Sequence, residues 1–202
     1  MLKALLVDMD GTLVHTANAN AAAYAAALAE HGVAADADAL APLIDGRSWR
    51  DFLPDLVAGH PATRPEDVAR RKREIYPRFF HLLRPNQPVI DLVRLLHGPL
   101  ATALVTTASA LATDAVLGHF GLHDLFDTLV TGDHVVQAKP APEGYAMAAQ
   151  LLGARPQECL VIEDSETGAA AASAFCGGLL RWSEPFPGAH ARGANRPSLV
   201  RH

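Results

Sequence analysis

An apolar run near the start of the chain leads directly into two aspartates, and this arrangement constrains the fold more than any other feature. Residues 2–7 are apolar except for Lys3, and Asp8, Asp10 and Gly11 follow. Such a run is typical of a strand in a parallel sheet that is covered on both faces. In open α/β sheets the ligand crevice lies outside the carboxyl ends of the strands. The sequence therefore predicts a ligand site here, where a hard cation such as Mg²⁺ would offset the repulsion between the two acids.

The segment after this run has the composition of a sharp turn. Gly11 allows the backbone to turn away from the strand, and we expect the Thr12 hydroxyl to hydrogen-bond within the turn. Taken alone, the Asp-x-Asp-Gly pattern also fits an Asx-rich turn or the start of a calcium loop. The rest of the chain is needed to distinguish these possibilities.

Three further apolar runs end in polar residues. They are Ala103–Val105 before Thr106 and Thr107, Thr128–Val130 before Thr131–Asp133, and Cys159–Ile162 before Glu163 and Asp164. In addition, Lys139-Pro140 precedes a helical pattern. Each feature has an ordinary interpretation: Thr106 or Ser109 as a helix cap, Lys139 as a solvated loop lysine, and the acidic pair as a helix N-terminus. Together, and in this order, they favour a catalytic site.

This ordered set resembles the haloacid dehalogenase-like (HAD) hydrolase superfamily, whose motifs are Asp-x-Asp, Ser or Thr, Lys and an acidic pair. The resemblance covers roughly residues 1–180. It implies that Asp8 is a nucleophile that forms an aspartyl-phosphate and that Asp10 is the general acid and base. Thr106, with Thr107 as the alternative, would hold a phosphoryl oxygen, and Lys139 would neutralise charge on Asp8 and on the phosphoryl group.

The same resemblance implies a Mg²⁺ cofactor. Asp8 and Asp164 would bind the ion through their carboxylates, and Asp10 would bind it through its backbone carbonyl. Glu163 is a weaker candidate, as a direct ligand or through water. Oxygen ligands of this kind are those that Mg²⁺ prefers.

Between Val14 and about Asn86 the strand-like runs give way to alanine-rich and charged helical patterns. Helices are predicted over residues 21–30, 38–44, 49–58 and 65–83, the last with a kink or break at Pro77. From Pro88 onward, strands and helices alternate again, as in a doubly wound sheet. We therefore predict an α/β fold: a doubly wound parallel sheet with an inserted all-helical cap. The expected boundaries are 1–14 and 87–182 for the catalytic core, 15–86 for the cap and 183–202 for an irregular tail.

The position of this insertion resembles the C1-type cap of the phosphoglycolate phosphatase and β-phosphoglucomutase branch. That resemblance implies that Arg47, Arg50 and Lys72 contact the polar end of a substrate, although each also fits an ordinary surface residue. The chain departs from the branch at His15-Thr16, where many relatives carry Asp-Thr or Asp-Ser. It also carries Asn20 where the mutases have a histidine, and this departure favours a phosphatase over a mutase.

Composition agrees with a cytoplasmic enzyme. Half of the 202 residues are apolar, so the chain can form a sizeable core. The formal charge of −5 argues against nucleic acid as a partner, and the basic run Arg70–Arg73 fits a solvated helix face. Two cysteines indicate no disulfide framework, and no apolar run has the length of a signal peptide or a membrane span. The oligomeric state and the natural substrate do not follow from the sequence.

The predicted function is Mg²⁺-dependent hydrolysis of a small phosphorylated metabolite through an aspartyl-phosphate, with a phosphosugar mutase as the alternative. A 2-haloacid dehalogenase normally lacks the second acid, here Asp10. A phosphoacceptor receiver domain shares the aspartate, hydroxyl and lysine but has no inserted cap. A non-catalytic phospho-ligand binding protein would tolerate loss of a catalytic group, and none of the motif residues is missing.

Overall fold

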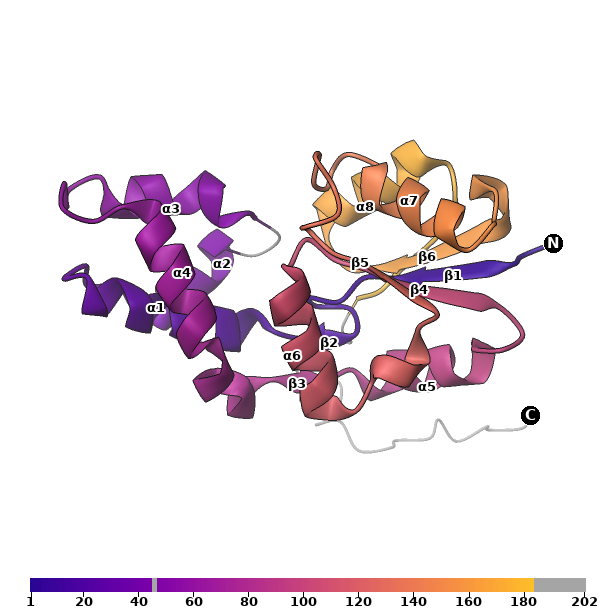
Figure 1. Cartoon of the computed structure of the whole chain (residues 1–202), viewed down its shortest axis with the longest axis horizontal. Coiled ribbons are helices and arrows are strands. Elements are labelled where there is room, and N and C mark those ends of the chain that lie inside the picture. Colours follow the sequence, from indigo (N-terminus) through magenta and orange to yellow (C-terminus); the bar gives the residue numbers. More distant parts are fainter. Residues whose placement is uncertain (45–46, 184–202) are drawn as a thin grey trace, which may run out of the picture.

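A five-stranded parallel sheet with helices on both faces forms the centre of the computed structural model, which describes residues 1–44 and 47–183 (Figure 1). The strands lie in the order β5 (Thr128–Val130), β4 (Ala101–Val105), β1 (Ala4–Val7), β6 (Cys159–Glu163) and β7 (Gly178–Arg181). The chain thus starts in the middle, winds to one edge through β4 and β5, and winds to the other through β6 and β7. The doubly wound α/β class predicted from the sequence is confirmed.

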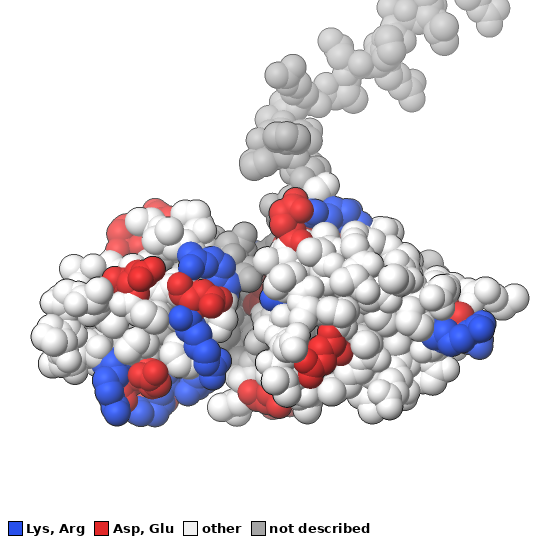
Figure 2. Space-filling model, turned by 90° about the horizontal axis from the view of Figure 1, so that it is seen from above, with Lys and Arg blue, Asp and Glu red and all other residues white. Residues whose placement is uncertain are grey.

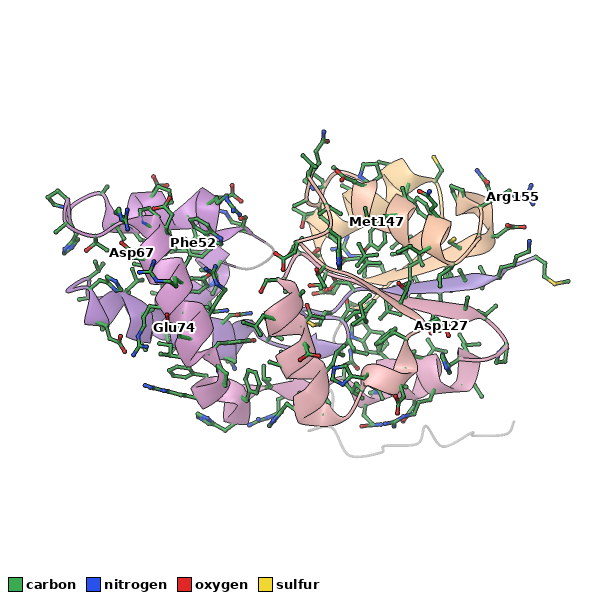
Figure 3. All side chains as sticks on the ribbon, in the orientation of Figure 1. Phe52, Asp67, Glu74, Asp127, Met147 and Arg155 are labelled. Carbon is green, nitrogen blue, oxygen red and sulfur yellow. The ribbon has the colours of Figure 1, made fainter. Side chains whose placement is uncertain are left out.

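Strand β1 is buried on both faces because its side chains alternate between two apolar clusters. Leu5 and Val7 belong to one cluster, and Ala4 and Leu6 belong to the other. The four helices that cover the sheet are α5 (Gln87–Leu96), α6 (Ala110–Phe120), α7 (Glu143–Leu151) and α8 (Glu166–Phe175). Helices α5 and α6 cover one face, and α7, which carries Met147, covers the other face with α8 (Figures 1 and 3).

Serine caps set the starts of two helices that border the carboxyl edge of the sheet. Ser109 accepts a hydrogen bond from the Ala112 amide at the start of α6, and Ser165 accepts one from the Gly168 amide at the start of α8. The interpretation of Ser109 as a helix cap is therefore confirmed. Helix α6 ends at Gly121, whose φ of 64° is the left-handed conformation that glycine adopts without strain.

In the described residues, helices make up the inserted segment between β2 and β3, and this segment has an apolar cluster of its own. Its elements are α1 (Ala17–Glu30), α2 (Ala37–Ile44), α3 (Trp49–Val57), α4 (Pro65–Ile75) and the 3-10 helix η1 (Tyr76–Leu82). The cluster includes Leu28, Leu53 and Phe52, and Figure 3 shows Phe52 between α3 and α4. The break expected at Pro77 is confirmed, since the α-helix gives way to the 3-10 helix there.

A two-stranded antiparallel ribbon joins the helical lobe to the sheet. Strand β2 (Val14–His15) pairs with β3 (Arg84–Pro85), so the segment that enters the helical lobe and the segment that leaves it lie side by side. Short 3-10 turns, η2 (His123–Leu125) and η3 (Pro156–Glu158), precede β5 and β6. The separate apolar cluster and the ribbon support the predicted core and cap boundaries, which remain a proposal.

The predicted tail lies outside the described residues from position 184 onward. No helix in the described ranges is long and apolar enough to span a membrane.

Candidate active site

The candidate site lies where the carboxyl ends of three neighbouring strands meet. Asp8 follows β1, Thr106 follows β4 and Glu163 ends β6, although 155 residues separate the first from the last. A cleft of about 1470 Å³ opens here between the sheet and the helical lobe. The predicted site residues that line it are Asp10, Thr107, Lys139 and Asp164 from the sheet side, and Arg47, Arg50 and Lys72 from the helical lobe.

The Lys139 ammonium links the carboxyl ends of β1, β4 and β6. It donates hydrogen bonds to Asp8 Oδ1, to Glu163 Oε1 at 3.0 Å and to the Val105 carbonyl at 3.1 Å. These three bonds use all the donors that a lysine has. The structure thus brings Asp8, Glu163 and Lys139 into one buried group, and Lys139 is not the solvated loop lysine that the sequence left open.

Burial and neighbouring charges set the ionisation of this group. Burial raises the pKa of Asp8 well above its ordinary value, Lys139 opposes that shift, and the charges of Glu163 and Asp10 reinforce it. Burial alone would lower the pKa of Lys139, but Asp8, Tyr145 and Glu163 raise it, so the ammonium keeps its proton at any physiological pH. The carboxylates outnumber this one cation, so the group is suited to a further cation.

Asp10 and Thr106 are in direct contact. The Asp10 carboxylate accepts hydrogen bonds from Thr16 Oγ1 at 2.5 Å and from Thr106 Oγ1 at 3.2 Å. Thr106 Oγ1 also accepts one from the Ala108 amide at 3.0 Å, so its hydroxyl is fixed at the strand end. Thr107 is exposed and lines the cleft instead.

Thr16 is a site residue that the sequence analysis treated only as a departure from the family pattern. Its hydroxyl lies six positions beyond Asp10 and returns to it because the chain reverses between them. Thr12 also differs from expectation. Its hydroxyl donates to Asp164 Oδ1 at 2.7 Å rather than within its own turn, and this bond connects the loop after β1 to the loop after β6.

The carboxylates of Asp8, Glu163 and Asp164 form a group that could hold a metal ion. One oxygen from each lies within 4.8 Å of the others. An all-oxygen donor set of this kind fits Mg²⁺. Glu163 is engaged with protein donors, because its carboxylate also accepts the Ser165 amide at 2.8 Å. The contacts of Glu163 with Lys139 and Ser165 make it a weaker candidate for a direct metal ligand than Asp8 or Asp164.

Two glycines allow the acidic residues to approach the backbone this closely. A Cβ at Gly168 would lie 1.6 Å from Glu163 Oε1, and a Cβ at Gly11 would lie 2.1 Å from Asp164 Oδ2. Gly11 also has a φ of +89°, which L side chains rarely adopt. Any other residue at either position would displace a carboxylate of the site.

Lys72 reaches the cleft from the helical lobe. Its ammonium donates to Asn20 Oδ1 at 2.6 Å and lies over the rings of Tyr76 and Tyr24, at 3.8 and 5.1 Å from their centroids. Burial lowers the pKa of Lys72 to about 8, and the charge of Asp10 opposes that shift. The expectation of a solvated face for the run at 70–73 is therefore wrong at this position, where the side chain turns into the lobe.

The two cap arginines are held differently. Arg47 donates to the backbone carbonyls of Leu43 at 3.2 Å and Asp51 at 2.8 Å, so it fastens the start of α3. The Arg50 guanidinium stacks on the Trp49 ring at 4.5 Å from its centroid. Both line the cleft, but only Lys72 is buried.

Comparisons with known proteins agree with this geometry. The sequence profile of the haloacid dehalogenase-like hydrolases matches residues 2–175. The chain is 32% identical to the fructose-1-phosphate phosphatase YqaB of Escherichia coli K12, over 84% of this chain and 90% of that protein. It is 30% identical to the validoxylamine A 7'-phosphate phosphatase of Streptomyces hygroscopicus subsp. limoneus, over 89% and 86% of the two chains.

A solved structure gives the same result. The HAD family hydrolase of Deinococcus radiodurans R1, determined with bound phosphate and sodium, superposes with a TM-score of 0.67 at 28% identity, over 88% of this chain and 79% of that one. The chain therefore belongs to the haloacid dehalogenase-like hydrolase family, as its motifs predicted. Its enzyme class is that of a phosphoric monoester hydrolase.

Proposed function

We propose that this protein is a Mg²⁺-dependent phosphatase that hydrolyses a small phosphorylated metabolite through an aspartyl-phosphate on Asp8. The observation that carries the proposal is the position of Asp8, buried at a strand end and hydrogen-bonded to the Lys139 ammonium. Asp10 lies at the same edge of the sheet and lines the cleft through which a substrate would enter. A nucleophile, a proton donor and a fixed cation are thus gathered at one place.

In this mechanism an Asp8 oxygen attacks phosphorus, and the bond from phosphorus to the ester oxygen breaks. Asp10 gives its proton to the leaving oxygen, and the phosphoryl group stays on Asp8. Asp10 then takes a proton from water, whose oxygen attacks phosphorus and restores the Asp8 carboxylate. Lys139 stabilises the negative charge of the phosphoryl oxygens in both steps, and the Thr106 hydroxyl and the backbone amides after it hold one of those oxygens.

Asp8, Asp164 and the Asp10 backbone carbonyl would hold the Mg²⁺ ion. The bound ion would supply charge neutralisation between the carboxylates and the phosphoryl group. The fit of this site rests on its oxygen donors and on the excess of acids over the single ammonium.

For the substrate we propose a phosphorylated sugar or a similar polar metabolite. The helical lobe presents Lys72, Arg47 and Arg50 to the cleft, and these groups donate hydrogen bonds to hydroxyl or anionic oxygens. Two of the relatives are named as a fructose-1-phosphate phosphatase and a validoxylamine A 7'-phosphate phosphatase, and these names support a substrate of this kind. A cytoplasmic location stays a prediction.

Metal dependence is the first expected result. Chelation with EDTA should abolish phosphate release, and added Mg²⁺ should restore it, because the acids of the site repel an unneutralised phosphoryl group. Asp164→Ala should raise the Mg²⁺ concentration needed for half-maximal activity by about tenfold or more. Full activity of the wild type in excess EDTA would contradict the proposal.

Lys72→Met is expected to stabilise the fold while it weakens activity. The lowered pKa means that burying the charged form at neutral pH costs about 3 kcal/mol. Loss of the contacts with the tyrosine rings and of the hydrogen bond to Asn20 offsets part of this, so we expect a net gain of ~1–2 kcal/mol in the free energy of unfolding. For a lysine of lowered pKa, the cost is fully present below about pH 8 and is lost as pH rises toward 10.5.

Denaturant unfolding at pH 7 and pH 10 measures this difference, with Arg70→Met as the control, because Arg70 is exposed on the same helix and does not line the cleft. The stability gain of Lys72→Met should shrink at pH 10, and its kcat/KM at pH 7 should fall by about 10- to 100-fold. Unchanged kcat/KM would remove Lys72 from the substrate site, and a loss of stability at pH 7 would contradict the account of its burial.

Release of phosphate rather than its transfer is the third expected result. Asparagine at position 20 does not titrate near neutral pH as a histidine would. Parallel ³¹P NMR of β-glucose 1-phosphate, with a trace of the bisphosphate, and of a panel of phosphorylated metabolites should show inorganic phosphate as the main product. Formation of glucose 6-phosphate faster than phosphate release from every compound would favour the mutase.

A further inference from the structure

The catalytic lysine lies over a buried tyrosine that the proposed mechanism does not use. Tyr145, on the first turn of α7, is 1% exposed, and the Lys139 Nζ lies 4.9 Å from its ring centroid. Neither Asp8 nor Glu163 hydrogen-bonds to its hydroxyl, which lies close to Lys139 but makes no hydrogen bond of good geometry with any described residue. A buried hydroxyl without a partner costs about 1–3 kcal/mol, so its retention beside a catalytic group requires an explanation.

The resting contacts of Lys139 explain why the hydroxyl is unsatisfied. All three ammonium hydrogens are donated elsewhere, to Asp8, Glu163 and the Val105 carbonyl. The Tyr145 hydroxyl therefore lies beside a strong donor that has no hydrogen left to give. Its environment is otherwise apolar, since the ring packs against Phe175 at 6.2 Å and the other members of its cluster are mostly alanine and valine.

The balance of these contacts changes when the phosphoryl group is on Asp8. The Asp8 oxygen that Lys139 contacts loses its carboxylate charge when the acyl phosphate forms, so this hydrogen bond weakens, although the phosphoryl oxygens carry negative charge of their own. The phosphoryl oxygens and Glu163, 3.0 Å away, then compete for the ammonium. A shift toward Glu163 would move the cation away from the phosphoryl group just before water attacks.

We propose that the Tyr145 hydroxyl accepts the hydrogen bond that Lys139 loses when Asp8 is phosphorylated, and so keeps the ammonium in place for the second half of the reaction. Tyr145 is thus a positioning residue that acts through Lys139. The inference rests on the aspartyl-phosphate mechanism proposed above. It assigns the hydroxyl a role in dephosphorylation and none in the fold.

Tyr145→Phe separates these roles because it removes only the hydroxyl. We expect this variant to melt at the same or a higher temperature than the wild type, since an unsatisfied buried group is lost. We expect its kcat to fall by about 3- to 10-fold, and the fraction of enzyme carrying phosphoryl-Asp8 in the steady state to rise. Rapid acid quench followed by mass analysis of the Asp8 peptide measures that fraction.

Phe175→Leu is the matched control, because it changes the packing against the same ring without touching the hydroxyl. It should lower stability and leave the phosphoenzyme fraction unchanged. A Tyr145→Phe enzyme with wild-type kcat and phosphoenzyme fraction would overturn the inference while leaving the mechanism intact. Phosphate release without phosphoryl-Asp8 in any variant would overturn the mechanism itself.

Discussion

An Asp8→Asn variant is expected to fold like the wild type and to lose about 10⁴-fold or more of its phosphatase activity. The amide has nearly the size of the carboxylate and still offers an oxygen to Lys139, which also keeps its bonds to Glu163 and the Val105 carbonyl. Burial already disfavours the charge at this position, so its removal should change the free energy of unfolding by no more than ~1 kcal/mol. Catalysis is lost because an amide is a poor nucleophile and a poor metal ligand.

Phosphate release and thermal unfolding, measured on the same preparation, test this expectation. Asp91→Asn is the matched control, since it makes the same chemical change on the exposed side of α5 and should leave both quantities unaltered. Wild-type turnover by a well-folded Asp8→Asn enzyme would remove Asp8 from the mechanism.

Asp10→Asn is expected to lower kcat by about 10²- to 10⁴-fold, the range associated with loss of a general acid and base. Its Mg²⁺ affinity should change little, because the proposed ligand at this position is the backbone carbonyl. Thr16 and Thr106 donate to different oxygens of Asp10, so the single amide oxygen of asparagine can keep the shorter bond from Thr16 while its NH2 group faces Thr106, and the loop should keep its conformation.

Turnover as a function of Mg²⁺ concentration distinguishes the two roles of Asp10. A severe loss of kcat at saturating metal agrees with the proposed proton transfer. A large loss of Mg²⁺ affinity with unchanged kcat would instead make the Asp10 side chain a metal ligand.

The sequence predicted that the proposed catalytic groups lie at one edge of the sheet because each follows a strong local signal. Asp8, Thr106 and Glu163 each come at the end of an apolar run, and parallel strands bring such ends to the same edge of a sheet. The break near Pro77 also followed from local chemistry, since proline lacks an amide hydrogen.

The contacts between these groups could not be predicted from the sequence because they depend on distances across the fold. Nothing near Thr12 indicates that its hydroxyl binds Asp164, 152 positions away. Lys72 belongs to a basic run, and its burial depends on tyrosines of α1 and η1 and on Asn20. Tyr145 has no distinguishing pattern, since a tyrosine on a buried helix face is ordinary core packing.

The structure also bears on the competing classes of protein. The Asp10 carboxylate accepts a hydrogen bond from Thr106 at the same sheet edge as Asp8, and this second acid is one that a 2-haloacid dehalogenase normally lacks. A receiver domain has no helical lobe between its first strand and the rest of its sheet, whereas α1 to α4 occupy that place here (Figure 1). Among its described residues, the helical lobe presents no continuous basic surface in the view of Figure 2, where basic and acidic side chains are intermixed. Arg70 pairs with Asp67, and Arg71 pairs with Glu30.

The central claim is that Asp8 carries the phosphoryl group during turnover. The most direct measurement is a rapid acid quench of the Asp10→Asn enzyme with Mg²⁺ and an aryl phosphate that the wild type hydrolyses, followed by mapping of the phosphorylated peptide. An aryl oxide leaves without a proton from Asp10, so the variant slows mainly the attack by water on the intermediate, and we predict phosphoryl on Asp8 in that variant and none in Asp8→Asn. Phosphoryl on another residue, or phosphate release by the wild type with none on Asp8 at any quench time, would contradict the account.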